Sequence, residues 1–579
     1  SSEIGNVLSG LAKEANIYFE FSTNEKVAME VAATAAASGL RSFTFMKHVG
    51  MNVASDSFMT TAYSGVNGGM VILSADDPSL FSSQNEQDTR NYGRLANVPI
   101  LEPSNCQEVK DMVKYAFDLS EQFKLPVIVR TTTRVSHMRG VVEFGEVVDN
   151  SSEGESHWKK GFFKKNPAQF VPVPAFAKDM HVALVEKMDE INKITNESDF
   201  NVESYFSQNK KYGVIASSSA YNYAYDVIRY NNLDIDVLKL GFSYPFPYDK
   251  VADFVKDYDE VFIVEEVDPI IEKDTLVAIG KNNLNTVVHG KLDGTFPVYH
   301  EFNSDIVANG FNKYLNFIEE NTDDYSDNLL NLQEEIPSRA PVLCAGCPHR
   351  AMYYGVNKAL EELGIPLKDA VFASDIGCYT LGINPPYNAA DYLLSMGSSV
   401  GDGCGFSIAT NQKVISFIGD STFFHSGISP LINAVHNKNN FILTVLDNRI
   451  TAMTGGQPNP GIPVDGMGDD APEISIRKLA LACGCNYVRV INPLNLDQVV
   501  KTYKEALERD EVCVIIAKAP CTLIKGKTRK PPVNYIDSNC NGCNKCVSEL
   551  ACPAISKDGG KITIDKSMCD GCGVCIQVC

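Results

Sequence analysis

The cysteines of this 579-residue chain are concentrated at its C-terminal end. Eight of the 17 fall between Cys540 and Cys579, in runs spaced Cys-x2-Cys-x2-Cys-x5-Cys and Cys-x2-Cys-x2-Cys-x3-Cys. The segment after Pro532 is too short to fold around an apolar core of its own, so bound metal must contribute to its folding. A disulfide framework is a poor explanation for a chain of this length with an odd number of cysteines. We therefore expect metal-bound thiolates in a reducing, cytoplasmic compartment.

The two runs resemble the pattern of bacterial two-cluster ferredoxins, in which the fourth cysteine of each run binds the cluster of the other run. The resemblance implies two 4Fe–4S clusters, one bound by Cys540, Cys543, Cys546 and Cys579, and the other by Cys569, Cys572, Cys575 and Cys552. The first run has five residues before Cys552, where the ferredoxin pattern has three, and this requires a larger loop. A pair of zinc knuckles is the less favoured alternative, because the two runs pair across each other.

The remainder of the chain is long enough for several domains. Its net charge of −21 argues against nucleic acid or an anionic membrane as a partner. No apolar run approaches the ~18 residues of a membrane span. Because the chain starts with Ser1 rather than methionine and stops on a predicted ligand, Cys579, we expect both ends to be truncated.

Alternating strand and helix patterns predict an α/β fold of parallel sheets covered by helices. In the first segment we expect strands at 17–21, 42–47, 69–75 and 126–130, and helices at 24–38 and 106–121. A second segment, about 210–330, has predicted strands at 212–216, 236–240 and 260–265, and is expected to serve packing and assembly. The polar stretches 149–166 and 319–335 are predicted connections, and a third α/β segment covers about 340–525.

Polar residues follow two predicted strands of the third segment. The strand at 413–419 ends in Gly419-Asp420-Ser421, and the strand at 441–446 is followed by Asp447-Asn448. In a parallel sheet these ends lie side by side, where Asp420 and Asn448 can bind a Mg²⁺ ion that holds a diphosphate. The pattern resembles the thiamin diphosphate motif, with Ser421 in place of its last glycine, and Ile450 is included in the predicted Mg²⁺ site. Two ordinary strand-to-loop turns are the alternative.

A second triplet, Gly401-Asp402-Gly403, matches the letters of that motif better. No predicted strand precedes it, and no asparagine lies at a strand end the right distance beyond it. We predict a glycine-rich turn near the cofactor.

The segment from Asp447 to Gln457, Asp-Asn-x4-Met-Thr-Gly-Gly-Gln, resembles a run found in the 2-oxoacid:ferredoxin oxidoreductases. That family uses thiamin diphosphate and iron–sulfur clusters together. In the order of its parts the chain resembles, over nearly its whole length, the large subunits of indolepyruvate:ferredoxin oxidoreductases. The resemblance implies a pyrimidine-binding domain at 1–165, a middle α/β domain at 166–335, a diphosphate- and Mg²⁺-binding domain at 336–530, and a two-cluster ferredoxin-like domain at 531–579.

Thiamin chemistry needs a sheltered carboxyl group beside the aminopyrimidine ring. Glu25 lies in the first turn of the predicted helix that follows the first strand. A glutamate at such a position is ordinarily explained by its favourable interaction with the helix dipole. The resemblance instead implies that Glu25 is the catalytic carboxyl, in preference to Glu30.

Residues 82–103 resemble the family loop that meets the carboxylate of the 2-oxoacid, an anion that suits an arginine fork. Arg94 is the first candidate and Arg90 the second, with a surface charge as the alternative for either. His48, His425 and Lys47 are candidate pocket residues that can equally be structural.

Further cysteines are predicted to hold a third cluster. In related enzymes a Cys-x2-Cys, a Gly-Cys and a Pro-Cys bind the cluster nearest the cofactor. The resemblance assigns the corresponding residues, Cys344, Cys347, Cys378 and Cys521, to a proximal 4Fe–4S cluster. We expect the remaining five, Cys106, Cys404, Cys483, Cys485 and Cys513, to be small buried apolar residues.

The resemblance implies oxidative decarboxylation of an aryl 2-oxoacid, indolepyruvate above all, with coenzyme A as acyl acceptor and ferredoxin as electron acceptor. It also implies a smaller beta subunit and a hetero-oligomer such as α2β2. The alternatives are an oxidoreductase for pyruvate or another 2-oxoacid, a non-oxidative thiamin-dependent decarboxylase or synthase, and an electron-transfer protein with an inactive thiamin fold. The cysteines disfavour the second of these, and the joint presence of Glu25, Asp420 and Asn448 disfavours the third.

Overall fold

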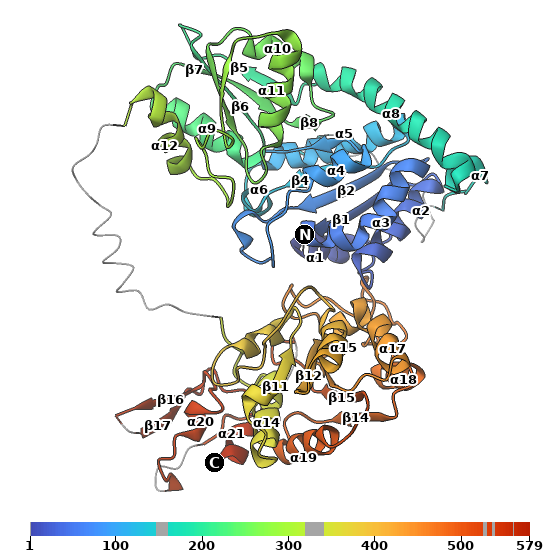
Figure 1. Ribbon diagram of the computed structural model, residues 1–579, viewed down its shortest axis with the longest axis vertical. Coiled ribbons are helices and arrows are strands. Elements are labelled where there is room, and N and C mark those ends of the chain that lie inside the picture. Colours follow the sequence, from blue (N-terminus) through green and yellow to red (C-terminus); the bar gives the residue numbers. More distant parts are fainter. Residues whose placement is uncertain (1, 146–159, 319–340, 525–529, 535–538, 560) are drawn as a thin grey trace. The chain divides into compact units, whose positions relative to one another are not determined.

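The computed structural model describes residues 2–145, 160–318, 341–524, 530–534, 539–559 and 561–579. Within these ranges the chain forms two compact units (Figure 1). The first unit lies within 24–332, and the second combines 2–23 with the part of the chain after 332. No helix in the described ranges is both long enough and apolar enough to cross a bilayer.

The first unit contains a five-stranded sheet of order β1-β2-β4-β3-β8. Its strands are β1 (Ser42–Lys47), β2 (Met70–Ala75), β3 (Ile100–Leu101), β4 (Val127–Thr131) and β8 (Phe242–Tyr244). Its helices are α2 (Glu25–Ala37), α3 (His48–Ser64), α4 (Arg90–Ala96), α5 (Cys106–Phe123) and α6 (Thr133–His137). The strands β1 to β4 are parallel, while β8 pairs antiparallel with β3. The helices bury residues such as Met29 and Phe58 against the sheet, which confirms the predicted helix-covered parallel arrangement.

The strand expected at 17–21 is absent from this described sheet, and that prediction is wrong. Residues 17–22 have no regular structure, and β1 is the edge strand. The alternating apolar residues Phe19 and Phe21 pack on each other, with ring centroids 4.9 Å apart. Phe21 also contacts Gly466 of the second unit, to which the whole segment 2–23 belongs. The alternation of apolar and polar residues at 17–21 therefore reflects packing of aromatic side chains and not pairing as a strand.

The first unit also contains a second sheet, of order β10-β9-β6-β7-β5. Its strands are β5 (Asn201–Ser204), β6 (Tyr212–Ala216), β7 (Ile235–Leu240), β9 (Glu260–Val264) and β10 (Val287–His289). The helices are α7 (Pro167–Phe170), α8 (Pro174–Asn196), α9 (Ser218–Tyr230), α10 (Tyr248–Val255), α11 (Ile270–Asn282) and α12 (Ser304–Leu315). The three predicted strands are confirmed to within one residue at each end. The predicted connections lie largely outside the described residues.

The second unit is built on a fully parallel sheet of order β11-β12-β13-β15-β14. Its strands are β11 (Ala370–Ala373), β12 (Lys413–Gly419), β13 (Ile442–Asp447), β14 (Tyr487–Ile491) and β15 (Cys513–Lys518). Its helices are α1 (Ser2–Leu11), α14 (Pro348–Glu362), α15 (Ser399–Ala409), α16 (Asp420–Thr422), α17 (Ile428–His436), α18 (Ile476–Ala482) and α19 (Leu496–Leu507). The strands predicted at 413–419 and 441–446 are thus confirmed.

Gly401-Asp402-Gly403 does not form the expected turn, because the triplet lies inside α15. A Cβ atom at Gly403 would lie 2.5 Å from Ser416 Oγ and 2.9 Å from the ring of Phe441. The glycine therefore allows the helix to approach the sheet closely, a second use of this residue type that the sequence pattern does not distinguish from a turn.

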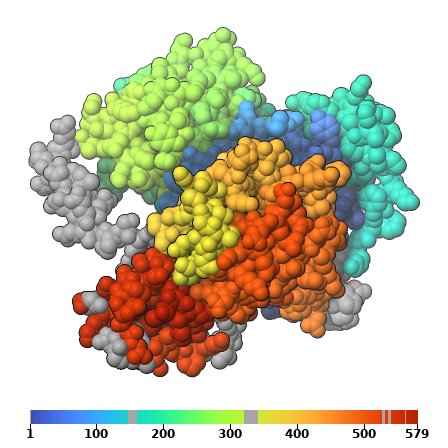
Figure 2. All heavy atoms as spheres, turned by 60° about the horizontal axis from the view of Figure 1, so that its bottom comes forward, coloured from blue at the N-terminus to red at the C-terminus, as the bar shows by residue number. Residues whose placement is uncertain are grey.

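The cysteine-rich tail contains a hairpin of β16 (Ile555–Asp558) and β17 (Lys561–Ile564) and two short helices, α20 (Lys545–Ser548) and α21 (Val574–Val578). Leu550 and Val574 of the tail pack with Ala351 of α14 and Leu496 of α19. Figure 2 shows the tail, in red, against the yellow and orange parts of the second unit. The tail is thus anchored by a small apolar contact.

Candidate functional site

Asp420 and Asn448 lie at the carboxyl ends of neighbouring strands in the second unit. The register pairs Gly419 of β12 with Leu446 of β13, which brings the two following polar segments side by side. Asp420 is 2% exposed, and its Oδ2 accepts hydrogen bonds from the backbone N–H of Arg449 and from Asn459 Nδ2, both at 3.0 Å. Asn448 is also buried, and its Oδ1 accepts from the N–H of Ile450 at 3.1 Å. The loop after β13 therefore folds over the carboxylate.

Two carboxyl groups, those of Asp420 and Asp447, lie close together at this edge of the sheet, and the neighbouring cations do not fully balance their charge. Burial, together with the adjacent Asp447, raises the pKa of Asp420 to about 7. Burial also raises the pKa of Asp447, although Arg449 and Lys518 oppose that effect. A divalent cation with oxygen ligands would relieve this pair. The sequence pattern indicates no role at this site for Asp447 or Asn459, because their contributions depend on how the loop folds back.

Ser421 follows Asp420 directly, and His425 lies four residues further along the chain. His425 is buried in a π-helical turn, Phe423–Gly427, and its Nδ1 lies 2.8 Å from Ser426 Oγ. Such turns occur often at functional sites. Ser421 Oγ accepts a hydrogen bond of 2.9 Å from Thr451 Oγ1, so it joins the turn after β12 to the loop after β13.

The segment that contains α1 packs on the same loop. Gln457 Nε2 donates to Asn6 Oδ1 at 3.0 Å, and Ser9 Oγ donates to the carbonyl oxygen of Gly466 at 2.5 Å. Lys13 pairs with Asp469 at 2.5 Å. The N-terminal helix therefore supports the loop that follows the predicted Mg²⁺ ligands.

Glu25 is the first residue of α2 in the first unit, and Asn24 caps this helix by accepting the N–H of Val27 at 2.9 Å. The Glu25 side chain lies against α3. A Cβ atom at Gly50 would lie 2.8 Å from Glu25 Cγ and 3.1 Å from Oε1. The bare backbone at Gly50 thus leaves the space that the Glu25 carboxyl occupies.

Lys47 and His48 join α3 to the loop that begins near Ser82. Lys47 Nζ lies 3.0 Å from Asp77 Oδ2 and 2.8 Å from the carbonyl oxygen of Ser82. His48 is fully buried, with Nε2 3.0 Å from the carbonyl oxygen of Asn85. Its Nδ1 has no hydrogen-bond partner within the described ranges. Both side chains therefore position the loop.

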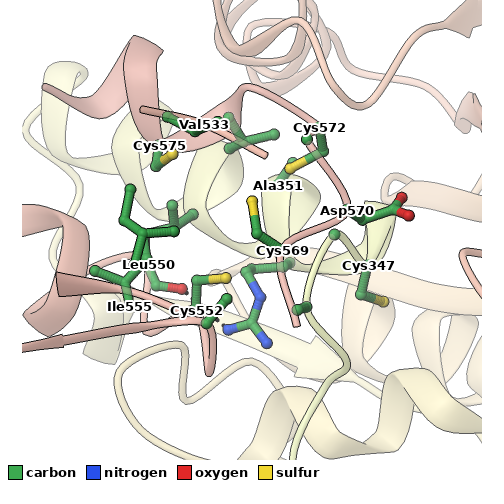
Figure 3. A pocket seen from close by; sticks show the side chains of 17 residues that line it. Cys347, Ala351, Val533, Leu550, Cys552, Ile555, Cys569, Asp570, Cys572 and Cys575 are labelled. Carbon is green, nitrogen blue, oxygen red and sulfur yellow. Dashed lines mark hydrogen bonds between the residues drawn. The ribbon is translucent and has the colours of Figure 1, made fainter. Parts of the chain in front are cut away.

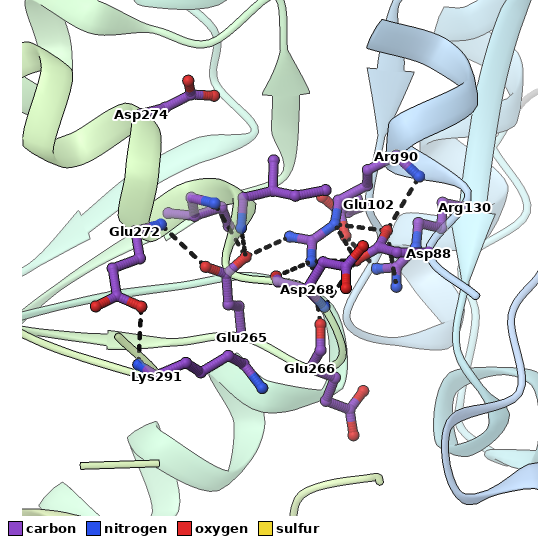
Figure 4. Close-up of polar contacts among 12 residues, drawn as sticks. Asp88, Arg90, Glu102, Arg130, Glu265, Glu266, Asp268, Glu272, Asp274 and Lys291 are labelled. Carbon is purple, nitrogen blue, oxygen red and sulfur yellow. Dashed lines mark hydrogen bonds and ion pairs between the residues drawn. The ribbon is translucent and has the colours of Figure 1, made fainter. Parts of the chain in front are cut away.

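Arg90 belongs to a buried ion-pair network that joins the two sheets of the first unit (Figure 4). Its Nη1 donates to Glu265 Oε2 at 2.7 Å, and its Nε and Nη2 donate to Asp88. Arg130, also buried, pairs with Asp76 and Glu102. Burial alone would raise the pKa of Asp88, but Arg130 and Arg90 lower it to about 2.

Arg94 has a different environment. Its side chain is 35% exposed and makes a bidentate contact with Asp274 on α11. Its guanidinium also lies 5.5 Å from the centroid of the Tyr244 ring. Sequence patterns did not indicate these partners, which lie 150 to 180 residues further along the chain.

We expect Arg90→Ala to destabilise the full chain by about 3–5 kcal/mol, because it removes the ion pair of the buried Glu265 and leaves the buried Asp88 with Arg130 alone. Arg134→Ala is the matched control: its ion pair with Glu301 is half exposed and worth about 0–1 kcal/mol. Urea-induced unfolding measures both. Unchanged stability with a raised substrate KM would instead place Arg90 in the substrate pocket.

The tail cysteines lie in two groups of four. Burial and the neighbouring thiols of Cys579, Cys543 and Cys540 raise the pKa of Cys546. In the other group, burial and the thiols of Cys572, Cys552 and Cys569 raise the pKa of Cys575 to about 11. The last cysteine of each run therefore lies with the first three of the other run.

A third group lies beside α14. Burial, then Cys521 and Cys344, raise the pKa of the Cys378 thiol, and burial raises that of Cys347 to about 12 with Cys344 nearby. In the described parts of the chain, no three His, Cys, Asp or Glu side chains converge closely enough to hold a single ion. Of the other five cysteines, Cys404, Cys485 and Cys513 are buried, and Cys106 and Cys483 are partly exposed.

Comparison with known proteins identifies thiamin-binding regions in both halves of the chain. The model described as "Pyruvate flavodoxin/ferredoxin oxidoreductase, thiamine diP-bdg" matches residues 1–207. That described as "Thiamine pyrophosphate enzyme, C-terminal TPP binding domain" matches 375–517. A solved 2-oxoglutarate:ferredoxin oxidoreductase from Magnetococcus marinus covers 32% of this chain and 67% of its own at 21% identity, with a TM-score of 0.30, too low to support an argument.

Curated relatives match the entire chain. Indolepyruvate oxidoreductase subunit IorA of Methanothermobacter marburgensis is 56% identical, over 100% of this chain and 91% of the relative. The protein of the same description from Pyrococcus horikoshii is 41% identical over the same shares. The chain therefore belongs to the family of indolepyruvate oxidoreductase IorA subunits.

Proposed function

We propose that this chain oxidatively decarboxylates an aryl 2-oxoacid, indolepyruvate, with coenzyme A, and passes the electrons through iron–sulfur clusters to ferredoxin. The products are the arylacetyl-CoA and CO2. The observation that carries the proposal is that one compact unit contains both a thiamin-diphosphate-binding domain and three groups of four cysteines. A non-oxidative thiamin enzyme has no use for those groups.

The residues at the strand ends fit a Mg²⁺-bound diphosphate. Asp420 and Asn448 would bind the ion through side-chain oxygens, with Gly419, Ser421 and Ile450 beside it. When bound, thiamin diphosphate supplies an electron sink for the loss of CO2, and the clusters carry single electrons. The uncompensated charge of Asp420 and Asp447 supports this assignment.

The roles proposed for the remaining site residues rest on where their side chains lie. The Glu25 carboxyl would hold a proton at the aminopyrimidine ring. We propose Arg94, which is partly exposed, for the substrate carboxylate in preference to Arg90, whose donors are occupied. His48 and His425 are proposed to line the pocket.

Gly50→Ala is expected to lower kcat by roughly 100-fold, because the added methyl group displaces the Glu25 carboxyl and small misplacements are costly in catalysis. Cofactor affinity should stay unchanged. Gly280→Ala, on α11 of the same unit with nothing within 4 Å of its Cβ position, is the control. Steady-state kinetics and thiamin diphosphate titration give the two readouts, and full activity in Gly50→Ala would contradict the proposed role of Glu25.

The chain is proposed to act with a second, smaller subunit, in a hetero-oligomer such as α2β2. The description of its relatives as subunits supports this partner. A cytoplasmic location stays a prediction from the cysteine content.

The test is anaerobic turnover by the complex purified with its partner subunit. Indolepyruvate, phenylpyruvate and pyruvate are compared, each with coenzyme A and a ferredoxin-type acceptor. We expect the highest kcat/KM with indolepyruvate. A preference for pyruvate would overturn the proposed substrate, and aldehyde release without ferredoxin reduction would overturn the proposed reaction.

A further inference from the structure

The tail group Cys552, Cys569, Cys572 and Cys575, called the inner group, shares a pocket with the Cys344–Cys347 turn, called the proximal turn, and with the start of α14 (Figure 3). The pocket is lined by all four of these cysteines and also by Cys347 and Arg350. At Gly346, where φ is +73°, a Cβ atom would lie 2.6 Å from Asp570 Cβ. The Cys344–Cys347 turn and the Cys569–Cys572 turn are thus in direct contact.

Arg350 connects the two segments. It follows Cys347 on α14 and is 4% exposed. On the proximal side its Nη2 donates to the carbonyl oxygens of Leu343 and Cys344. On the tail side its Nη1 donates to the carbonyl oxygens of Leu550 and Ala551, directly before Cys552.

One donor of this guanidinium is left over. Within the described residues Arg350 Nε is buried and has no hydrogen-bond partner. A buried donor of a charged group without an acceptor costs free energy, so its persistence in a pocket lined by the inner group and Cys347 indicates an acceptor there. The sulfur atoms of a cluster are such acceptors, and hydrogen bonds to them help to set its reduction potential.

We propose that Arg350 is a positioning residue that ties the proximal turn to the inner group and that its Nε–H donates to the cluster bound there, raising that cluster's reduction potential. The positive charge and the hydrogen bond both stabilise the reduced, more negative cluster. The inference rests on the proposed function, because it requires 4Fe–4S clusters at these cysteines.

The test is an anaerobic redox titration of the purified complex, followed by electron paramagnetic resonance. The signal of the inner cluster is the one lost in Cys572→Ala. In Arg350→Gln we expect the equilibrium constant for reducing this cluster to fall about tenfold, or ~59 mV for one electron. The other signals should keep their potentials.

Two further variants separate this effect from simple loosening of the tail. Tyr387→Phe removes a hydroxyl that accepts from Arg350 Nη1 at 2.6 Å and donates to the carbonyl oxygen of Leu550 at 2.5 Å, yet it leaves Nε intact. Its inner-cluster potential should match wild type. Arg350→Lys keeps the charge without the Nε–H, and its potential should fall between wild type and Arg350→Gln.

An unchanged potential in Arg350→Gln, or an equal shift of every signal, would overturn the inference. If Arg350→Gln loses the inner cluster, the potential of that cluster is measured in Arg350→Lys instead. A wild-type potential in Arg350→Lys would also overturn the inference. A wild-type complex without any iron signal would overturn the proposed function and this inference together. Three iron signals whose reduction potentials are the same in wild type and in the Arg350 variants would overturn only the inference.

Discussion

Replacing Asp420 with alanine is expected to abolish retention of thiamin diphosphate. Its carboxylate is buried at the end of β12 beside Asp447, where it is the strongest candidate for a Mg²⁺ ligand. Loss of a side chain that hydrogen-bonds to a metal ligand typically lowers metal affinity by about 10–100-fold. Removal of the ligand itself should therefore weaken cofactor binding by about 100-fold or more. Calorimetric titration with Mg²⁺ and thiamin diphosphate measures the change, together with cofactor content after desalting.

Asp402→Ala is the matched control, because it alters the aspartate of the Gly401-Asp402-Gly403 triplet. The Asp402 carboxylate lies on α15 and accepts a hydrogen bond of 2.8 Å from Ser398 Oγ. Its loss should leave cofactor binding within a few-fold of wild type. The opposite pattern, with binding lost in Asp402→Ala and kept in Asp420→Ala, would move the cofactor site to α15.

Cys572→Ala is expected to spare decarboxylation and cut electron delivery. On the proposed assignment the inner cluster would lose a ligand, so the complex should contain about four fewer iron atoms per chain. Ferredoxin reduction should fall by on the order of 100-fold. A single turnover should still release CO2, because Glu25 and Asp420 are untouched. Iron analysis, ferredoxin reduction and single-turnover CO2 release give the three readouts.

Cys483→Ala serves as the control for Cys572→Ala. Cys483 lies in the same unit, outside the three groups of four cysteines, and burial raises the pKa of its thiol. Iron content and ferredoxin reduction should both match wild type. Unimpaired ferredoxin reduction in Cys572→Ala would show that electrons leave by a route that omits the inner group.

The sheets and the polar sheet edge at Asp420 and Asn448 could be predicted from the sequence because their signals are local. Buried apolar runs gave β12 and β13, and polar residues at their ends placed Asp420 and Asn448. The register that brings them together follows from parallel pairing alone. The two-run cysteine pattern likewise predicts which fourth cysteine belongs to which cluster, and that ligand assignment stays a prediction.

What could not be predicted depends on distant partners. Arg90 pairs with Glu265, 175 residues away, and no local pattern distinguishes that buried network from a substrate-binding arginine. Gly403 marks a close helix–sheet contact, although glycine more often marks a turn. The alternation at 17–21 is that of a strand, yet this segment pairs with no sheet in the described parts of the chain.

The N-terminal segment has a consequence for biosynthesis. Residues 2–23 leave the ribosome before the first unit does, but their contacts, such as Asn6 with Gln457, form with residues made more than 400 positions later. The first unit can mature during translation, while α1 must wait for the second half of the polypeptide. Deletion of α1 should therefore leave the early-folding half intact and impair the late one.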